Sequence, residues 1–442
     1  ASTGRAGLLQ LVDLAPTAVT VLGRPPPEPG RLAGHVAYAA AGRPDDLAEA
    51  VQIMVATEQE AAGTAAVTGW FLAALTVGQL LLFTAVVPLL RRPWRSAQGR
   101  WRPVAPVLLV AAVLLVPAAL AAGVIPWWQT AAGAALFVTL VALVVSALTA
   151  AVVLTPLFRH TLAVVGTCAA LAAAVVAVDL LARSQLQLNG VVGYSAHDGV
   201  RFAGISAAGL GALTAGVLLT AGVLAQQVPR RWRPAVVVAL GGLGVVLAGS
   251  PYLGADPAAA MALIAGVCVA AAMCTGGWLT LSRLGWAVLA GAAVTGAVAL
   301  TDLWRPAEQR VGLGAFVTDL TQGRAGYAAR RLSLASAEAL LDSPLTLLAI
   351  GAAAFAWFAL LRPWGGLHRL FGIYPALRAG MMGTLVAALL AGVLTGSALT
   401  VAGAAAAVAV PLVTLAALRV REQVAARGEV DDPQPVPSRL LG

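Results

Sequence analysis

The sequence predicts an all-α integral membrane protein with about eleven transmembrane helices and a short N-terminal extracytoplasmic segment. Hydrophobic residues make up 60% of the chain and charged residues only 11%, whereas soluble domains carry about 25% charged residues. The mean hydropathy is +0.87. Long uncharged stretches recur between Val67 and Leu418, and a bilayer core requires about 20 apolar residues for each spanning helix.

Each expected span is an apolar stretch bounded by charged, proline-rich or turn-forming residues. The last two spans are separated only by Gly396, Ser397 and the small residues beside them. The eleven expected spans are residues 67–90, 104–125, 131–155, 161–182, 207–228, 234–250, 258–281, 285–303, 344–361, 379–397 and 398–418.

Arginine positions predict the orientation of these spans. All 28 basic residues are arginine, and they concentrate in alternate loops such as residues 91–102, 230–233 and 362–378. The positive-inside rule places those loops in the cytoplasm. We therefore expect a multi-pass protein of the plasma (inner) membrane with its N-terminus outside and its C-terminus cytoplasmic. The net charge of +9 does not indicate nucleic-acid binding, because the arginines form no basic arm or soluble basic face.

The segments outside the spans complete the expected organisation. An outside N-terminus must be carried across the membrane, yet residues 1–30 lack the successive regions of a signal peptide. We therefore expect the chain to be the C-terminal part of a longer precursor. The expected parts are an extracytoplasmic remnant (1–46), a linking helix (47–66), the transmembrane domain (67–420) with outer loops 183–206 and 304–343, and a disordered cytoplasmic tail (421–442).

The N-terminal stretch "LVDLAPTAVTVLGRPPPEPGRLAGH" contains an Asp-x-x-Pro-Thr motif, a Gly that can end a short helix, and a Pro-rich exit. This stretch resembles the closing segment of alkaline-phosphatase-superfamily domains, in which a late strand runs into such a turn. The positions that match are Val12, Asp13, Pro16, Thr17, Leu22, Gly23, Pro27 and Gly34. The superfamily's nucleophilic Ser or Thr and its metal-binding Asp and His residues lie far upstream of this segment. The resemblance therefore implies an upstream ectodomain of the same precursor and places its catalysis outside this chain.

The long outer loop carries a second resemblance. Its Gly-Tyr-Ser sequence at 193–195 and its Arg-Phe-x-Gly-Ile sequence at 201–205 are similar to a loop in a group of uncharacterised actinobacterial polytopic membrane proteins with a phosphatase-like ectodomain. The Gly-Asn that closes the motif in that group is replaced here by Ser206 and Ala207. The Gly-Ala-Asp sequence ending at Asp256 matches a further outer loop of the same group.

Charged residues at the outer ends of the spans are the candidate site, because charges within a membrane protein are usually paired, interfacial or functional. A shared outward-facing cavity would bind a phosphate through its arginines or a cation through its carboxylates. The alternative is that each acid caps a helix or pairs with a neighbouring arginine. The candidates are Asp179, Asp198, Arg201, Asp256, Asp302 and Arg305, with Tyr194 and His197 as secondary candidates.

His197 is a possible general base or metal ligand, or a solvated loop residue. Cys168, Cys268 and Cys274 lie within spans without metal-ligand spacing, so no metal site is predicted. No cofactor is indicated.

Three functions fit these observations. The first is the membrane module of a cell-envelope protein that handles phosphorylated lipid or glycan precursors on the outer face. The second is a transporter or lipid flippase, although no internal repeat or pair of broken helices marks a central site. The third is a polyprenyl-phosphate-sugar glycosyltransferase. The third ranks last because the loop "IPWWQTA" after the second span contains no acid. The sequence leaves open whether the chain is an enzyme, a transporter or a scaffold; its expected partner in every case is the lipid bilayer.

Overall fold

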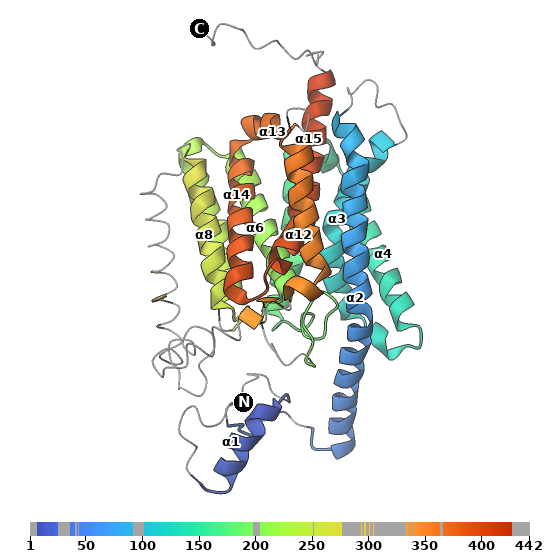
Figure 1. The fold of residues 1–442 in the computed structure, drawn as a ribbon, viewed down its shortest axis with the longest axis vertical. Coiled ribbons are helices and arrows are strands. Elements are labelled where there is room, and N and C mark those ends of the chain that lie inside the picture. Colours follow the sequence, from blue (N-terminus) through green and yellow to red (C-terminus); the bar gives the residue numbers. More distant parts are fainter. Residues whose placement is uncertain are drawn as a thin grey trace.

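The computed structural model shows a bundle of long apolar helices (Figure 1). The residues that it describes are 7–24, 36–39, 42, 44–91, 101–197, 204–250, 252–275, 339–362 and 366–426, with isolated positions between 293 and 337. Within them, nine helices are long and apolar enough to cross a membrane, and the apolar helix Pro344–Leu360 is shorter. The chain is therefore a multi-pass helical membrane protein.

Eight helices lie in the described chain up to Cys274. Short 3-10 turns lie between several of them at Ala122–Val124, Trp127–Gln129, Pro156–Arg159 and Arg230–Trp232. The helices are α1 (Leu11–Val21), α2 (Leu47–Arg91), α3 (Trp101–Ala121), α4 (Gly133–Leu154), α5 (Thr161–Leu181), α6 (Ala207–Gln227), α7 (Arg233–Gly249) and α8 (Pro257–Cys274).

The C-terminal helices follow the same apolar pattern. Helix α12 continues into a π-helical turn, Ala356–Leu360. Gly396 ends α14 in the left-handed conformation, with φ 74°, which glycine adopts without steric cost. The expected division between the last two spans is thus confirmed. The helices are α12 (Pro344–Phe355), α13 (Leu367–Ile373), α14 (Pro375–Thr395) and α15 (Thr400–Ala426).

The expected count of eleven spans is not confirmed. The expected span 285–303 lies almost entirely outside the described residues, as does most of the expected loop 304–343. The other ten expected spans coincide with α2 to α8, with α12 and its π-helical turn, and with α14 and α15. The expected linking helix and the first span lie in one continuous helix, α2. Its 45 residues give a length of about 68 Å at 1.5 Å per residue, more than twice the roughly 30 Å of a hydrocarbon core.

The N-terminal motif differs in conformation from the strand and turn that the phosphatase resemblance implies. Asp13, Pro16 and Thr17 all lie inside helix α1, which begins at Leu11. Gln10 and Asp13 form a capping box at its start, and this local hydrogen bonding favours a helix that begins before the proline. Gly23 follows the helix with φ 71°, as expected for a left-handed stop.

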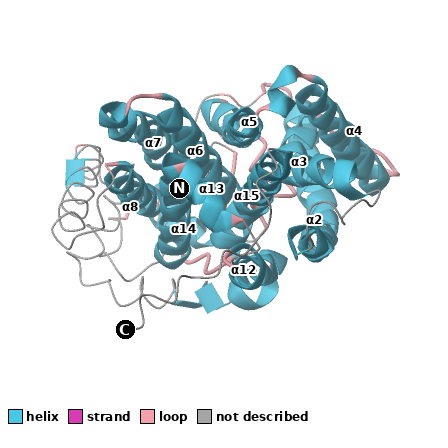
Figure 2. Ribbon diagram, turned by 90° about the horizontal axis from the view of Figure 1, so that it is seen from above, coloured by secondary structure: helices cyan, strands magenta, loops and turns pink. Residues whose placement is uncertain are grey.

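Helix α15 lies at the centre of the bundle (Figure 2). It packs against α6, α12, α3, α14 and α5. In its most apolar stretch 89% of residues are buried, and in that of α6 78% are buried, compared with 28% in α4. Large apolar side chains such as Leu143 and Leu243 are more than half exposed, as expected of surfaces that face lipid tails.

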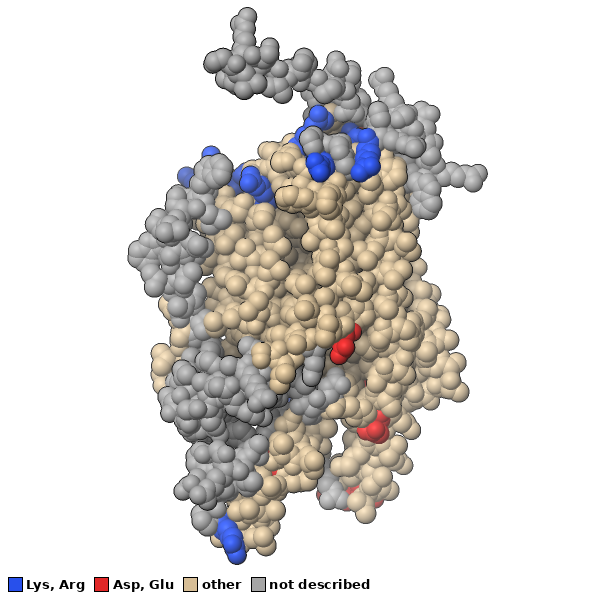
Figure 3. Space-filling view, in the orientation of Figure 1, with Lys and Arg blue, Asp and Glu red and all other residues tan. Residues whose placement is uncertain are grey.

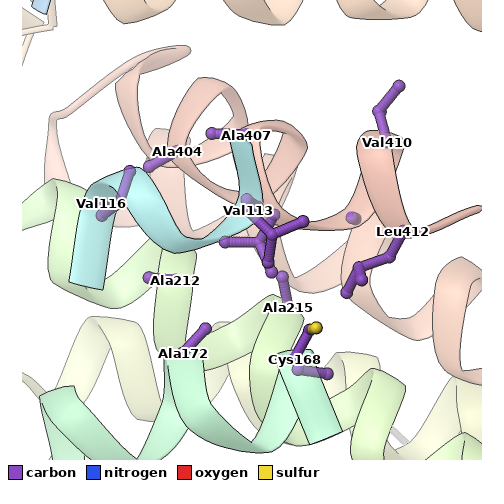
Figure 4. Packing of buried hydrophobic residues seen from close by; sticks show 14 of the residues in the cluster. Val113, Val116, Cys168, Ala172, Ala212, Ala215, Ala404, Ala407, Val410 and Leu412 are labelled. Atoms are coloured by element: carbon purple, nitrogen blue, oxygen red, sulfur yellow. The ribbon is translucent and has the colours of Figure 1, made fainter. Parts of the chain in front are cut away.

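Small residues fill the centre between these helices. In Figure 4, Val113, Val116, Cys168, Ala172, Ala212, Ala215, Ala404 and Ala407 of helices α3, α5, α6 and α15 lie close together. A Cβ added to Gly211 of α6 would lie 2.5 Å from the backbone oxygen of Val401, and one added to Gly216 would lie 2.6 Å from that of Ala169. The backbones therefore touch at these glycines, which is the contact that small residues permit in membranes.

One buried polar side chain joins three helices in the middle of the bundle. Gln79 of α2 is 1% exposed, and its Nε2 donates hydrogen bonds to the carbonyl oxygens of Ala112 in α3, at 3.2 Å, and Ala407 in α15, at 3.1 Å. Interhelical hydrogen bonds of this kind contribute to association in lipid. Nothing in the sequence analysis singled out Gln79.

Arginine residues concentrate at one end of the bundle. In Figure 3 most visible arginine atoms lie at the end that carries α13 and the last turns of α15, and visible acidic atoms lie toward the other end. We call these the arginine end and the loop end, after the long loop 182–206. The described arginines of the arginine end are Arg91, Arg159, Arg230, Arg231, Arg233, Arg362, Arg369, Arg378, Arg419 and Arg421.

The contact between α8 and α14 yields a test of this packing. A Cβ on Gly266 would lie 2.5 Å from the backbone oxygen of Gly383 and 2.6 Å from Cβ of Ala387. We expect Gly266→Ala to lower the free energy of unfolding by about 1–3 kcal/mol, because the helices must separate to admit the methyl group. Thermal unfolding of the purified protein in detergent measures the change.

Gly78→Ala is the matched control, because a Cβ at this helical glycine of α2 meets no atom within 4 Å. Alanine also has the higher helix propensity, so this variant should unfold at the wild-type temperature or slightly above it. Equal destabilisation by both substitutions would contradict the proposed backbone contact.

Candidate functional site

Four of the eight candidate residues lie within the described residues, all at the loop end. They are Asp179, Tyr194, His197 and Asp256. Asp198, Arg201, Asp302 and Arg305 lie outside the described residues, so the convergence of all the charged candidates in one cavity remains a prediction.

Asp179 holds the long loop against the bundle. It lies in the last turn of α5 with 1% of its surface exposed. Its Oδ1 accepts a hydrogen bond from the backbone N–H of Leu186 at 2.7 Å, and its Oδ2 accepts one from Nε2 of Gln187 at 2.9 Å. Because hydrogen bonds to an ionised acceptor are strong, this carboxylate fixes the turn that follows α5.

Gln187 extends the network to the start of α6. Its Oε1 accepts from the backbone N–H of Ser206 at 2.6 Å. The hydroxyl of Ser206 accepts from the N–H of Gly209 at 3.0 Å, which caps α6, and donates to the carbonyl oxygen of Val192 at 3.0 Å. Ser206 thus acts as the N-cap of α6.

Asn189 connects the middle of the loop to α2. Its backbone carbonyl accepts from the hydroxyl of Thr64 at 2.6 Å, and its Oδ1 accepts from the N–H of Ala196 at 3.0 Å. The residue adopts a left-handed φ of 53°, a conformation that Asn tolerates better than most residues. The loop is therefore anchored on α2, α5 and α6 together.

Tyr194 and Asp256 belong to the junction between this loop and the α7–α8 connection. The hydroxyl of Tyr194 donates to the carbonyl oxygen of Gly204 at 3.2 Å, and the N–H of Ile205 donates to the carbonyl oxygen of Gly254 at 2.9 Å. Asp256 is 4% exposed, and its Oδ1 accepts from the N–H of Ala259 at 2.8 Å. Asp256 therefore caps α8, as the helix-capping alternative expected.

His197 pairs with the N-terminal part of α2, which projects beyond the other helices of the bundle (Figure 1). Its Nε2 lies 3.0 Å from Oε2 of Glu58, and the two side chains are 45% and 69% exposed. Exposed pairs of this kind contribute little to stability. Among the described residues, no group of three His, Cys, Asp or Glu side chains is placed to hold a metal ion.

A cavity lies beside this loop, and its residues were not singled out by the sequence analysis. The cavity volume is about 270 Å³, open solvent included. Its walls come from α2, the loop-end parts of α3 and α4, the 3-10 turns at 122–129 and the long loop. Its lining includes Glu60, Leu120, Trp127, Trp128, Phe137 and Asn189. Glu60 of α2 is the acidic residue of this lining, and it lies more than sixty residues before the "IPWWQTA" loop in the sequence.

Comparisons with protein-family models, with curated proteins and with solved structures found no match to this chain. The functional proposals below therefore rest on the residue geometry and on the sequence features described above.

The Asp179 network predicts a specific response to an isosteric substitution. In Asp179→Asn one oxygen becomes an NH₂ group, so either orientation of the new amide faces a donor, Leu186 N–H or Gln187 Nε2. Gln187 cannot turn to compensate without losing its bond from Ser206. We expect Asp179→Asn to lower the free energy of unfolding by about 1–3 kcal/mol, the cost of a buried unsatisfied group. We also expect faster proteolysis within residues 184–197.

Asp45→Asn is the control, because Asp45 is exposed just before the start of helix α2. It should change neither the unfolding temperature nor the proteolysis pattern. An Asp179→Asn protein with wild-type stability would show that the carboxylate does not support the loop.

Proposed function

We propose that this chain is the membrane module of a cell-envelope protein that handles phosphorylated lipid or glycan precursors at its loop end. In this proposal the loop end faces outward across the plasma membrane, and the arginine end faces the cytoplasm. The concentration of arginines at one end supports this orientation through the positive-inside rule. The association with an upstream phosphatase-like ectodomain rests on the sequence resemblance of residues 12–34.

The observation that carries the proposal is the ordered structure of the long loop. Helix connections in bundles usually take roughly two to eight residues, and much longer ones are generally either functional or disordered. The connection between α5 and α6 spans residues 182–206. Gln187, Asn189, Val191 and Val192 are all more than nine-tenths buried within it. In this proposal Arg201, which belongs to the same loop in the sequence, contacts the ligand.

A phosphate ligand is supported by the types of residue in these outer segments. Arg201 lies in the long loop and Arg305 in the expected outer loop 304–343. Arginine presents a planar fork of donors that matches the oxygens of a phosphate. In this proposal the lipid part of such a precursor lies against the transmembrane helices, and its phosphate lies at the level of the outer segments.

The packing of the bundle favours this proposal over a transporter. A transporter requires polar groups along a path through the membrane. In the described helices, the centre between α3, α5, α6 and α15 is instead filled mainly by apolar side chains (Figure 4), and the buried Gln79 beside them donates to backbone carbonyls of α3 and α15.

Lipid binding in nanodiscs tests the proposal. We expect the full chain to bind a polyprenyl phosphate at least tenfold more tightly than the corresponding polyprenol, as measured by native mass spectrometry. Arg201→Gln and Arg305→Gln should each reduce that preference by about tenfold, because each loses a charge-assisted contact worth roughly 1.4 kcal/mol.

Arg183→Gln is the matched control, because Arg183 is an exposed arginine at the start of the same loop. It should leave the preference within twofold of wild type. Equal binding of the phosphate and the alcohol, or an equal loss in Arg183→Gln, would overturn the proposal.

A further inference from the structure

The cavity at the loop end has rigid aromatic walls. Trp127 is 2% exposed, and its ring lies 5.7 Å from that of Trp128 and 5.0 Å from that of Phe137. A Cβ on Gly63 of α2 would lie 2.8 Å from Cβ of Trp128, and one on Gly133 would lie 2.9 Å from the backbone oxygen of Trp127. These glycines allow α2 and α4 to close on the tryptophan pair, so the position of the rings is fixed by the backbone.

Two polar side chains line the same cavity. Glu60, from the projecting part of α2, contributes a carboxylate. Asn189, 2% exposed, contributes an amide whose Nδ2 is buried with no hydrogen-bond partner among the described residues. The orientation of that amide is settled by its Oδ1, which accepts from Ala196 N–H. Buried donors without a partner are rare in folded proteins.

The combination of these groups indicates the charge of a ligand. A carboxylate attracts a cation, and the faces of tryptophan rings bind ammonium groups through their quadrupole. The unpaired donor of Asn189 would be satisfied by an uncharged or phosphate oxygen carried beside the cationic group.

The size of the cavity restricts the cation further. The cavity has room for about one water-sized group. A primary ammonium has that size, whereas a trimethylammonium group does not.

We propose that the cavity formed by Glu60, Trp127, Trp128 and Asn189 binds the primary ammonium group of an ethanolamine-type ligand. Glu60 is the counter-ion, the indole rings enclose the ammonium, and Asn189 donates to an oxygen next to it. The same ammonium chemistry is available from a phosphatidylethanolamine headgroup at the membrane surface or from a soluble amine. This inference rests on the cavity alone and does not depend on the proposed phosphate ligand.

The first test uses the wild-type chain. In nanodiscs of mixed phosphatidylethanolamine and phosphatidylcholine, native mass spectrometry measures which lipid stays bound after the protein is released from the disc. In detergent, thermal unfolding with added ethanolamine or choline measures binding of the soluble amines. We expect at least a tenfold preference for the ethanolamine compound in one of these two arms; the lipid arm identifies a headgroup site and the soluble arm identifies a free amine.

The second test removes the charge. Glu60→Gln keeps the shape of the side chain and should reduce the ethanolamine preference about tenfold, whereas Glu49→Gln, an exposed acid at the start of the same helix, should leave it unchanged. Equal binding of ethanolamine and choline compounds in both arms would overturn the proposal, as would binding of neither. Retention of the full preference in a folded Glu60→Gln protein would also overturn it. If Glu60→Gln does not fold, the proposal is tested by the comparison of ethanolamine and choline compounds in the wild-type chain.

Discussion

Close contact between helix backbones is the constraint on which this structure depends. Lipid tails are as apolar as the side chains of the helices, so no hydrophobic force drives helices together inside a bilayer. Association then relies on dispersion contacts, and these require short distances. Glycines such as Gly211, Gly216 and Gly266 provide them by bringing one backbone directly against the next. The many Ala and Gly residues of the central helices α6 and α15 are thus required for their close packing.

A bundle packed in this way leaves its polar chemistry to its ends. Within the described middle of the bundle, Gln79 is the clearest polar link, and it joins three helices. At the loop end the situation is reversed, because buried carboxylate, amide and hydroxyl groups satisfy the backbone of a long connection. Asp179, Gln187 and Ser206 form one continuous chain of hydrogen bonds there. The loop is consequently part of the folded body. The cavity beside Trp127 is rigid because both the loop and α2 form its walls.

The fold was largely predictable from the sequence because apolar length is a strong signal in a membrane protein. The expected spans from 104–125 to 234–250 agree with α3 to α7 to within a few residues, and even the short break at Gly396 was expected. The N-terminal motif was predicted less well. The resemblance implied a strand and a turn before a short helix with Pro16 in its first turn, whereas helix α1 begins already at Leu11, where Gln10 and Asp13 form a capping box.

The site was much less predictable for a physical reason. A buried acid in a membrane protein has the same sequence signature whether it binds a ligand or caps backbone N–H groups, and Asp179 and Asp256 contact backbone donors. Glu60, Trp127 and Asn189 meet only because α2 projects beyond the bundle and the long loop folds back onto it. None of the three stands in a recognisable motif, and no spacing along the chain relates them.

The long loop is a folded element held by Asp179. Hydrogen–deuterium exchange of the wild-type chain in nanodiscs tests it most directly, through peptides that contain the amides of Leu186 and Ser206. Both amides donate to buried side-chain oxygens, so the account predicts exchange that is slowed to the rate of the helical amides at the start of α6. Exchange as fast as that of an unstructured, solvated peptide would contradict it.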